Sequence, residues 1–247
     1  MSAWAGIKTI AKRELSAYFE SPVAYVFLVI FLLLSGFFTF TFGGFFERGE
    51  ASLTAFFNWL PWLFLFLVPA VGMRLWSEEQ RLGTLELLLT LPVTPSQAII
   101  GKFLASWLFL GIALALTFPV IITVNWLGDP DNGVIAAGYV GSLFLAGSYL
   151  AITSMTSALT RNQVVAFILS VVLCLLLILV GFQPLTDLLS RWAGPAFIEA
   201  VANFSVVTHY DGFQKGVLDT RDLLYFASVI GFALFTTGVI IRSRRAD

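Results

Sequence analysis

Long stretches without an acidic or basic residue divide the chain. Six of them lie between Glu20 and Glu47, Glu50 and Arg74, Lys102 and Asp129, Asp131 and Arg161, Arg161 and Asp187, and Asp222 and Arg242. Each can hold the roughly 20 apolar residues that cross a hydrocarbon core of about 30 Å. A charge at the bilayer centre costs about 2.5–3.5 kcal/mol, which is why the gaps are informative. We predict six transmembrane helices near residues 23–43, 55–73, 101–125, 134–157, 164–182 and 223–241.

Composition supports an all-α membrane protein. Of the 247 residues, 58% are hydrophobic and 12% are charged, about half the charged fraction of a typical soluble domain. The net charge of -1 provides no basic field for phosphates, so we expect no nucleic-acid partner. Cys174 and His209 are the single cysteine and histidine, which argues against a disulfide framework, a bound metal or a cofactor on this chain.

The positive-inside rule orients the spans. Six crossings place both termini on one side of the membrane. With the termini inside, ten of the 14 Lys and Arg residues fall on the cytoplasmic side, against Arg48, Arg191, Lys215 and Arg221 outside. We therefore expect both ends in the cytoplasm, with residues 74–90 exposed there and residues 183–222 forming an extracytoplasmic segment.

Residues 3–20 have the pattern of an amphipathic helix. Apolar positions from Trp4 to Tyr18 recur at helical spacing, and a helix of this kind lies in the headgroup plane. The residues expected to act there are Lys8, Lys12, Arg13, Glu14 and Tyr18. The helix is either an orientation anchor bound to membrane lipid or a lever that also touches a cytoplasmic partner.

The segment 74–90 concentrates charge beside the membrane. Gly83 can end one short helix and Thr84 can cap the next. Further on, Thr94 followed by Pro95 is typical of a helix start, so the third helix should begin before it enters lipid. The segment is either a solvated loop or a helical ridge that fits a groove on a soluble partner.

The same segment resembles the cytoplasmic loop of permease subunits of type-2 ABC exporters. The matching positions are Arg74, Glu78, Glu79, Gly83, Thr84, Glu86, Leu87, Leu88, Pro92, Val93, Gly101 and Lys102. Residues 14–25 are similar to the start of the first span in that family. The likeness narrows to permeases associated with gliding motility and with nitrous-oxide-reductase maturation, and it covers essentially the whole chain.

The resemblance implies a working complex. In that family the loop forms a coupling helix on the ATPase subunit, so Arg74, Glu78, Glu79, Gly83, Thr84, Glu86, Leu87 and Leu88 become candidate coupling residues. No phosphate-binding loop occurs in the sequence, so the chain is not expected to be an enzyme. ATP and magnesium would be held by two copies of a separate ATPase. A second permease, either a copy or a paralogue, would complete the complex in a bacterial inner membrane.

Two further groups of residues follow from the resemblance. In the family the dimer seam is lined by the first and fifth spans, which makes Ser35, Thr39 and Thr41 candidates for a translocation path, suited to lipidic cargo. Three residues near the last span are candidates for contact with a periplasmic partner or an exiting substrate: His209, Asp211 and Phe213. Short helices are expected from about 184 to 191 and from 195 to 203.

Three functions therefore remain open. The first is an ATP-driven export permease. The second is a mechanotransmission permease that energises a periplasmic or motility machine without cargo crossing. The third is a stand-alone channel or scaffold.

Overall fold

The computed structural model describes residues 3–47, 49, 51–85, 94–181, 194 and 203–243. Within these residues every regular element is helical, which confirms the all-α fold. The elements are α1 (Ala3–Glu20), α2 (Pro22–Phe37), the π-helix η1 (Phe38–Phe42), α3 (Thr54–Gly72), α4 (Arg74–Leu82), α6 (Pro95–Ala115), α7 (Phe118–Leu127), α8 (Asn132–Leu159), α9 (Gln163–Leu179), α12 (Val206–Gln214) and α13 (Thr220–Ser243).

Five helical stretches of the described chain are long and apolar enough to cross a membrane. They are Pro22–Phe42, Thr54–Leu82, Pro95–Leu127, Asn132–Leu159 and Thr220–Ser243. The sixth helix at a predicted span is α9, whose 17 residues extend only about 25 Å. A helix was expected to continue to residue 182, but the chain leaves the helix at Val180 and Gly181.

The third predicted span, 101–125, is not one straight helix. It begins earlier, at Pro95, because Thr94 and Gln97 form a reciprocal capping box, which confirms the expected start. It is then interrupted at Leu116 and Thr117, between α6 and α7. Pro119 lies in the first turn of α7, and a proline there removes one backbone N–H and clashes with the preceding turn of a continuous helix. The two helices together still form one stretch, Pro95–Leu127, that is long and apolar enough to cross a membrane.

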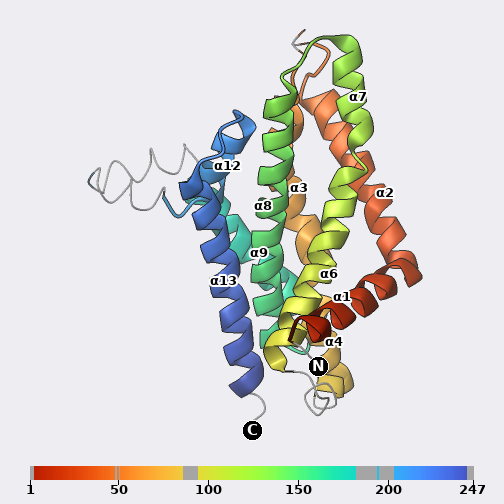
Figure 1. Ribbon diagram of the computed structural model, residues 1–247, viewed down its shortest axis with the longest axis vertical. Coiled ribbons are helices and arrows are strands. Elements are labelled where there is room, and N and C mark those ends of the chain that lie inside the picture. The colour runs from red at the N-terminus through yellow and green to blue at the C-terminus, as the bar shows by residue number, and fades with distance from the viewer. Residues whose placement is uncertain are drawn as a thin grey trace.

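Helix α8 is the centre of the bundle. It contacts α3, α4, α6, α9, α12 and α13, and Figure 1 shows it running along the long axis between them. Small residues allow this close packing, as they do in many membrane bundles. At Gly141, an added Cβ would lie 2.5 Å from Phe213 Cβ of α12. A larger residue at this position would push α12 away from α8.

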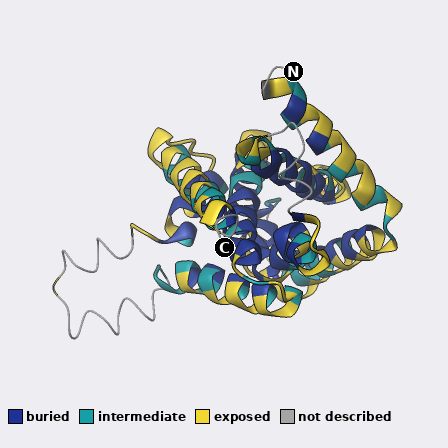
Figure 2. Cartoon of the chain, turned by 90° about the horizontal axis from the view of Figure 1, so that it is seen from below, coloured by how far each residue is buried: buried dark blue, intermediate teal, exposed yellow. Residues whose placement is uncertain are grey.

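The lower end of the bundle in Figure 1 carries α1, α4 and both ends of the chain, and α1 lies across the other helices. Seen from this end, many outward-facing positions of the outer helices are exposed (Figure 2). They include large apolar side chains such as Leu33 on α2, Leu176 on α9 and Phe232 on α13. Apolar side chains at such positions are suited to contact with lipid or with another membrane helix.

The coupling residues Glu86, Leu87 and Leu88 lie outside the described residues, as do nearly all of the two short helices expected between 184 and 203. The structure therefore does not bear on those expectations.

The predicted topology can be tested by cysteine labelling in a Cys174→Ala background. Asp129 and Arg81 are both exposed, at opposite ends of the bundle. A cysteine replacing Asp129 should react with an impermeant maleimide in intact cells, whereas one replacing Arg81 should react only after permeabilisation. The reverse pattern would contradict the orientation, and equal labelling of both sites in intact cells would contradict the crossing between them.

Candidate functional site

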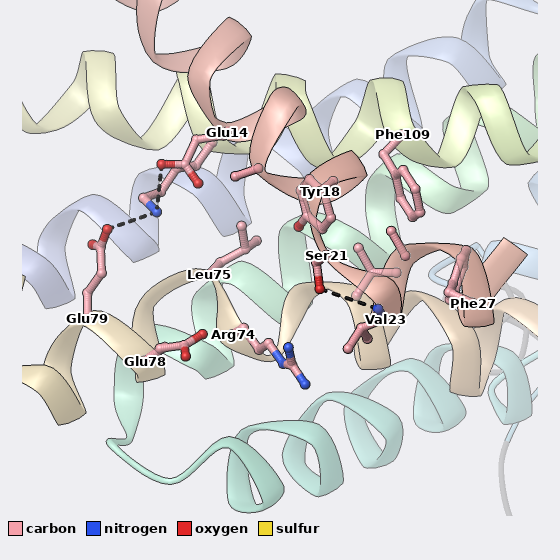
Figure 3. A pocket seen from close by; sticks show the side chains of 14 residues that line it. Glu14, Tyr18, Ser21, Val23, Phe27, Arg74, Leu75, Glu78, Glu79 and Phe109 are labelled. Atoms are coloured by element: carbon pink, nitrogen blue, oxygen red, sulfur yellow. Dashed lines mark hydrogen bonds and ion pairs between the residues drawn. The ribbon is translucent and has the colours of Figure 1, made fainter.

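A buried lysine joins three helices at the end of the bundle that carries α1 and α4. Lys102 Nζ of α6 lies 3.4 Å from Glu14 Oε1 of α1 and 2.9 Å from Glu79 Oε1 of α4. The lysine side chain is 6% exposed and each glutamate side chain 19%. Figure 3 draws both ion pairs as dashed lines between the two labelled glutamates. We call Glu14, Glu79 and Lys102 the lysine clasp.

The charges of the clasp hold one another in place. Burial raises the pKa of Glu14, but the charges of Lys102 and Arg13 together with their hydrogen bonds outweigh burial, so the net pKa is lowered from 4.5. Because the folded pKa is the lower one, the stabilisation from Glu14 is complete above about pH 4.5 and is lost as the pH falls through the folded value. Lys102 also lies over the Trp76 ring, 5.5 Å from its centroid, which adds a cation–π attraction.

Close packing fixes α1 on α6 beside the clasp. An added Cβ at Gly101 would lie 2.8 Å from the Ile10 side chain, so glycine permits the approach. Tyr18 stacks on Phe109 with ring centroids 5.0 Å apart, and its hydroxyl lies 2.9 Å from Ser106 Oγ. Burial raises the pKa of Tyr18 to about 12, so the hydroxyl stays protonated at neutral pH and can hydrogen-bond to the serine.

Helix α4 continues α3 and is capped by α8. Only Met73 separates α3 from α4, and its backbone is right-handed helical. Ser157 Oγ of α8 accepts from the backbone N–H groups of Trp76 and Ser77 at 3.0 Å each and donates to Met73 O at 2.8 Å. N–H groups in a first helical turn often lack a partner within their own helix. Here a serine from a distant helix satisfies two of them.

Two side chains of α4 extend this attachment to α8. Trp76 Nε1 donates to Ser154 Oγ at 2.9 Å, and Gln80 Nε2 donates to the Ala158 carbonyl at 2.8 Å. All the residues of α4 in these bonds are buried. As a result, one face of α4 is bonded to α8 while Arg74, Arg81 and Leu82 are exposed on the remainder.

The structure distributes the predicted coupling residues unequally. Glu79 belongs to the lysine clasp, whereas Glu78 is half-buried and faces Arg81 at 3.9 Å. Gly83 ends α4 in the left-handed region, with φ 71°, as expected. The Thr84 hydroxyl donates to Glu79 O at 3.5 Å, and the backbone N–H groups that it was expected to cap, at residues 86 and 87, lie outside the described residues.

The residues predicted for the interfacial helix also divide into two groups. Glu14 and Tyr18 face α6, as described above. Lys8, Lys12 and Arg13 are exposed, and Arg13 contacts Glu14 at 2.8 Å. One face of α1 is therefore bonded to the bundle, and the exposed face is cationic.

Sequence reasoning missed the roles of Lys102, Trp76 and Ser157. Lys102 had a recognisable signal, because it is a lone cation inside a helix whose next charged residue is Asp129. A cation in that position usually has a buried partner. Ser157 had no such signal, since it lies 81 residues from Trp76.

The three candidate path residues do not share one surface. Ser35 and Thr39 are buried, and their hydroxyls donate to Leu32 O at 3.1 Å and Ser35 O at 2.6 Å within the same helical stretch. Thr41 is exposed. Only Thr41 can therefore face lipid or a second chain without rearrangement.

At the opposite end of the bundle, α12 is bonded to both α8 and α13. His209 Nδ1 lies 2.7 Å from Asp222 Oδ1, and Nε2 lies 3.0 Å from Asn203 O. Phe213 is buried against α8, whereas Asp211 is exposed and pairs with Lys215. Of the three predicted contact residues, His209 and Phe213 thus hold the helix in place, and Asp211 is on the surface.

The cap that Ser157 of α8 provides for α4 leads to a prediction about the stability of the protein. Ser157→Ala leaves two buried N–H groups without their acceptor, so it should lower the free energy of unfolding by about 2–3 kcal/mol. Ser148→Ala on the same helix is the matched control, because the buried Ser148 hydroxyl has no partner among the described residues. Thermal unfolding in detergent should show a lower midpoint for Ser157→Ala only, and equal midpoints would contradict the role of the cap.

The ion pairs of the lysine clasp lead to a second prediction about stability. Lys102→Met leaves two partly buried carboxylates without their cation, which should cost about 3–5 kcal/mol. Adding Glu14→Gln and Glu79→Gln removes those charges and should recover most of the loss. Thermal unfolding of the single and triple variants distinguishes this from a packing defect, because a packing defect would persist in the triple variant.

Comparison with known proteins agrees with this architecture. The family described as ABC-2 family transporter protein matches residues 8–237, which include most of α1 and all of the clasp, α8 and α12. No curated protein matches the chain. This family comprises multi-pass membrane permeases that work with an ABC ATPase subunit and are not ATPases themselves. Because the match covers nearly the whole chain, the protein belongs to the ABC-2 transporter family.

Proposed function

We propose that this chain couples ATP hydrolysis by a separate ATPase subunit to export or to work on the far side of the membrane. In this proposal the end with α1 and α4 faces the cytoplasm and the chain crosses a bacterial inner membrane six times, with α9 as the fifth span. Two ATPase subunits bind beneath two permeases, and ATP and magnesium remain on the ATPases.

The attachment of α4 is the observation that carries the proposal. A force applied to a loosely held loop would bend the loop without moving the membrane helices. Helix α4 instead continues α3, is capped by Ser157 of α8 and is paired through Glu79 with α6. Displacement of α4 therefore requires α3, α6 and α8 to move with it, which is the property needed in a coupling helix.

The exposed part of α4 is suited to the ATPase contact. Arg81, Leu82, Gly83 and Thr84 are exposed beside the end of this helix. We propose that these residues, with Glu86, Leu87 and Leu88, form the docking surface, while Glu79 acts inside the permease. Of the eight coupling candidates, five are thus assigned to the contact and Glu79 to holding the helix, while Arg74 and Glu78 line a pocket beside α4.

Large apolar side chains on the outer faces of α2 and α9 support pairing with a second permease. Leu33 and Phe37 on α2, and Ile168 and Leu176 on α9, are each at least 50% exposed. Residues of this kind can pack against a copy or a paralogue, with Thr41 as a polar exception near the seam. Hydrophobic or lipidic cargo would suit such a lining.

Mechanotransmission is a second candidate, favoured by the bonds of α12. Tyr210 of α12 lies 2.7 Å from Ser142 of α8 through their hydroxyl oxygens, and His209 pairs with Asp222 of α13. Motion of α8 would therefore reach the extracytoplasmic surface directly. A periplasmic or motility machine bound there could be driven without cargo crossing, as the resemblance to gliding-motility permeases suggests.

The end of α4 provides the test of coupling. Gly83 has φ 71° and space for a side chain, so Gly83→Val strains the backbone without a clash and should cost about 1–2 kcal/mol. That is sufficient to redirect the chain after α4, and we expect stimulation of the ATPase by the permease to fall roughly 5–30-fold.

Gly49→Val is the matched control, because Gly49 has φ 63° and equal space but lies on the other side of the predicted membrane. Membrane insertion should be normal in both variants. ATPase stimulation that is unchanged in Gly83→Val, or reduced equally in both variants, would count against coupling through α4.

A further inference from the structure

A pocket of about 280 Å³ is lined by the three residues of the lysine clasp and by further residues of α1, α2, α3, α4 and α6. Figure 3 shows ten of the side chains that line the pocket, labelled, on several different helices. The polar residues that line it include Ser21, Arg74, Glu78 and Glu79, and the apolar ones include Val23, Phe27, Val71 and Phe109. The pocket thus has a charged part and an apolar part.

Two opposite charges in this pocket are held apart. Arg74 and Glu78 are four residues apart on α4, a spacing that commonly allows an ion pair. Among the described residues Arg74 nevertheless forms no ion pair, and Glu78 has only the 3.9 Å contact with Arg81. Both side chains line the same pocket (Figure 3). A guanidinium and a carboxylate therefore face it separately, about one helical turn apart.

A third polar group in the pocket lacks a partner. Glu79 Oε1 is bound by Lys102, but Glu79 Oε2 is buried and has no hydrogen-bond donor among the described residues. A buried carboxylate oxygen without a donor is costly. The carboxylate that is open to a ligand in this pocket is that of Glu78, whose side chain is 40% exposed.

The apolar part of the pocket leads to a lipid-facing surface. Val23 and Phe27 are in the first turns of α2, and the outer side of that helix continues with Val26, Val29 and Ile30, which are 56%, 55% and 42% exposed. In a membrane-spanning helix such a surface is covered by acyl chains or by another apolar helix. A ligand that fits the whole pocket has a charged head and an apolar tail.

We propose that this pocket binds a zwitterionic phospholipid whose headgroup ends in a primary ammonium, as in phosphatidylethanolamine. The guanidinium of Arg74 binds the phosphate, for which its planar donors are well suited. The ammonium donates to the carboxylate of Glu78. The acyl chains follow Val23, Phe27 and the outer side of α2 as far as Ile30, whereas Leu33 and Phe37 beyond it face the second permease. This site does not depend on the coupling function, because it requires only that the pocket lie at the membrane surface.

Charge selects this lipid over its common alternatives. A glycerol headgroup has the same phosphate but no ammonium, so it supplies no cation to the Glu78 carboxylate. A choline headgroup carries the positive charge but has no N–H group, so it cannot donate to a carboxylate oxygen. Only the primary ammonium provides both the charge and the donors.

Native mass spectrometry of the full-length chain in detergent tests the proposal. The protein is titrated with phosphatidylethanolamine, phosphatidylcholine and phosphatidylglycerol of identical acyl chains. We expect phosphatidylethanolamine to bind about tenfold more tightly than the other two. Arg74→Gln should weaken binding of all three about tenfold, whereas Glu78→Gln should remove the preference for ethanolamine over choline. Arg81→Gln is the control, since Arg81 is on the same helix but does not line the pocket.

Several results would overturn the proposal. Equal binding of the ethanolamine and choline lipids by the unmodified chain would remove the role of the ammonium. Equal effects of Arg74→Gln and Arg81→Gln would remove the role of the pocket. Displacement of the lipid by inorganic phosphate would assign the site to free phosphate, and displacement by the ATPase subunit would assign it to that partner. Glu79 need not be mutated, so the test leaves the lysine clasp intact.

Discussion

The arrangement of the end of the bundle that carries α1 and α4 depends on burying one ammonium group between two carboxylates. Removing Lys102, Glu14 and Glu79 from water costs several kcal/mol per charge, and their mutual attraction is the main offset, with smaller contributions from Arg13 and the Trp76 ring. The three residues come from α6, α1 and α4. If one of these helices moved away from the others, a buried charge of the clasp would lose a partner of opposite sign. The three helices are therefore held in one relative position. Specific positioning, rather than added stability, is the main consequence of such a buried group.

Hydrogen bonds from α8 complete this unit. Ser157 satisfies the start of α4, and Ser154 and the Ala158 carbonyl hold Trp76 and Gln80. Helix α8 also contacts α12 and α13 on its other sides. A path of direct contacts therefore runs from the surface of α4, through α8, to the opposite end of the molecule. Both export and mechanotransmission can use this path, and they differ only in what responds at its far end.

The sequence was sufficient for the helical class and for most helix positions, because charge-free gaps and capping residues act locally. The Thr94 cap and the left-handed Gly83 are examples. The break at residues 116–117 was missed because Pro119 was not weighed within an apolar run. The Ser157 cap could not be predicted, since its spacing from Trp76 follows from how α8 packs. Lys102 lies between these cases, because its position inside a helix marked it as unusual while its partners depend on the fold.

The central claim is that the lysine clasp makes α1, α4 and α6 one mechanical unit. Hydrogen–deuterium exchange of the full chain in nanodiscs, compared between the unmodified protein and Lys102→Met, tests this most directly. The account predicts that amides of α1 and α4 lose protection together, while those of α12 are unchanged. Loss of protection in α1 with α4 unaffected, or no change in either helix, would contradict the claim.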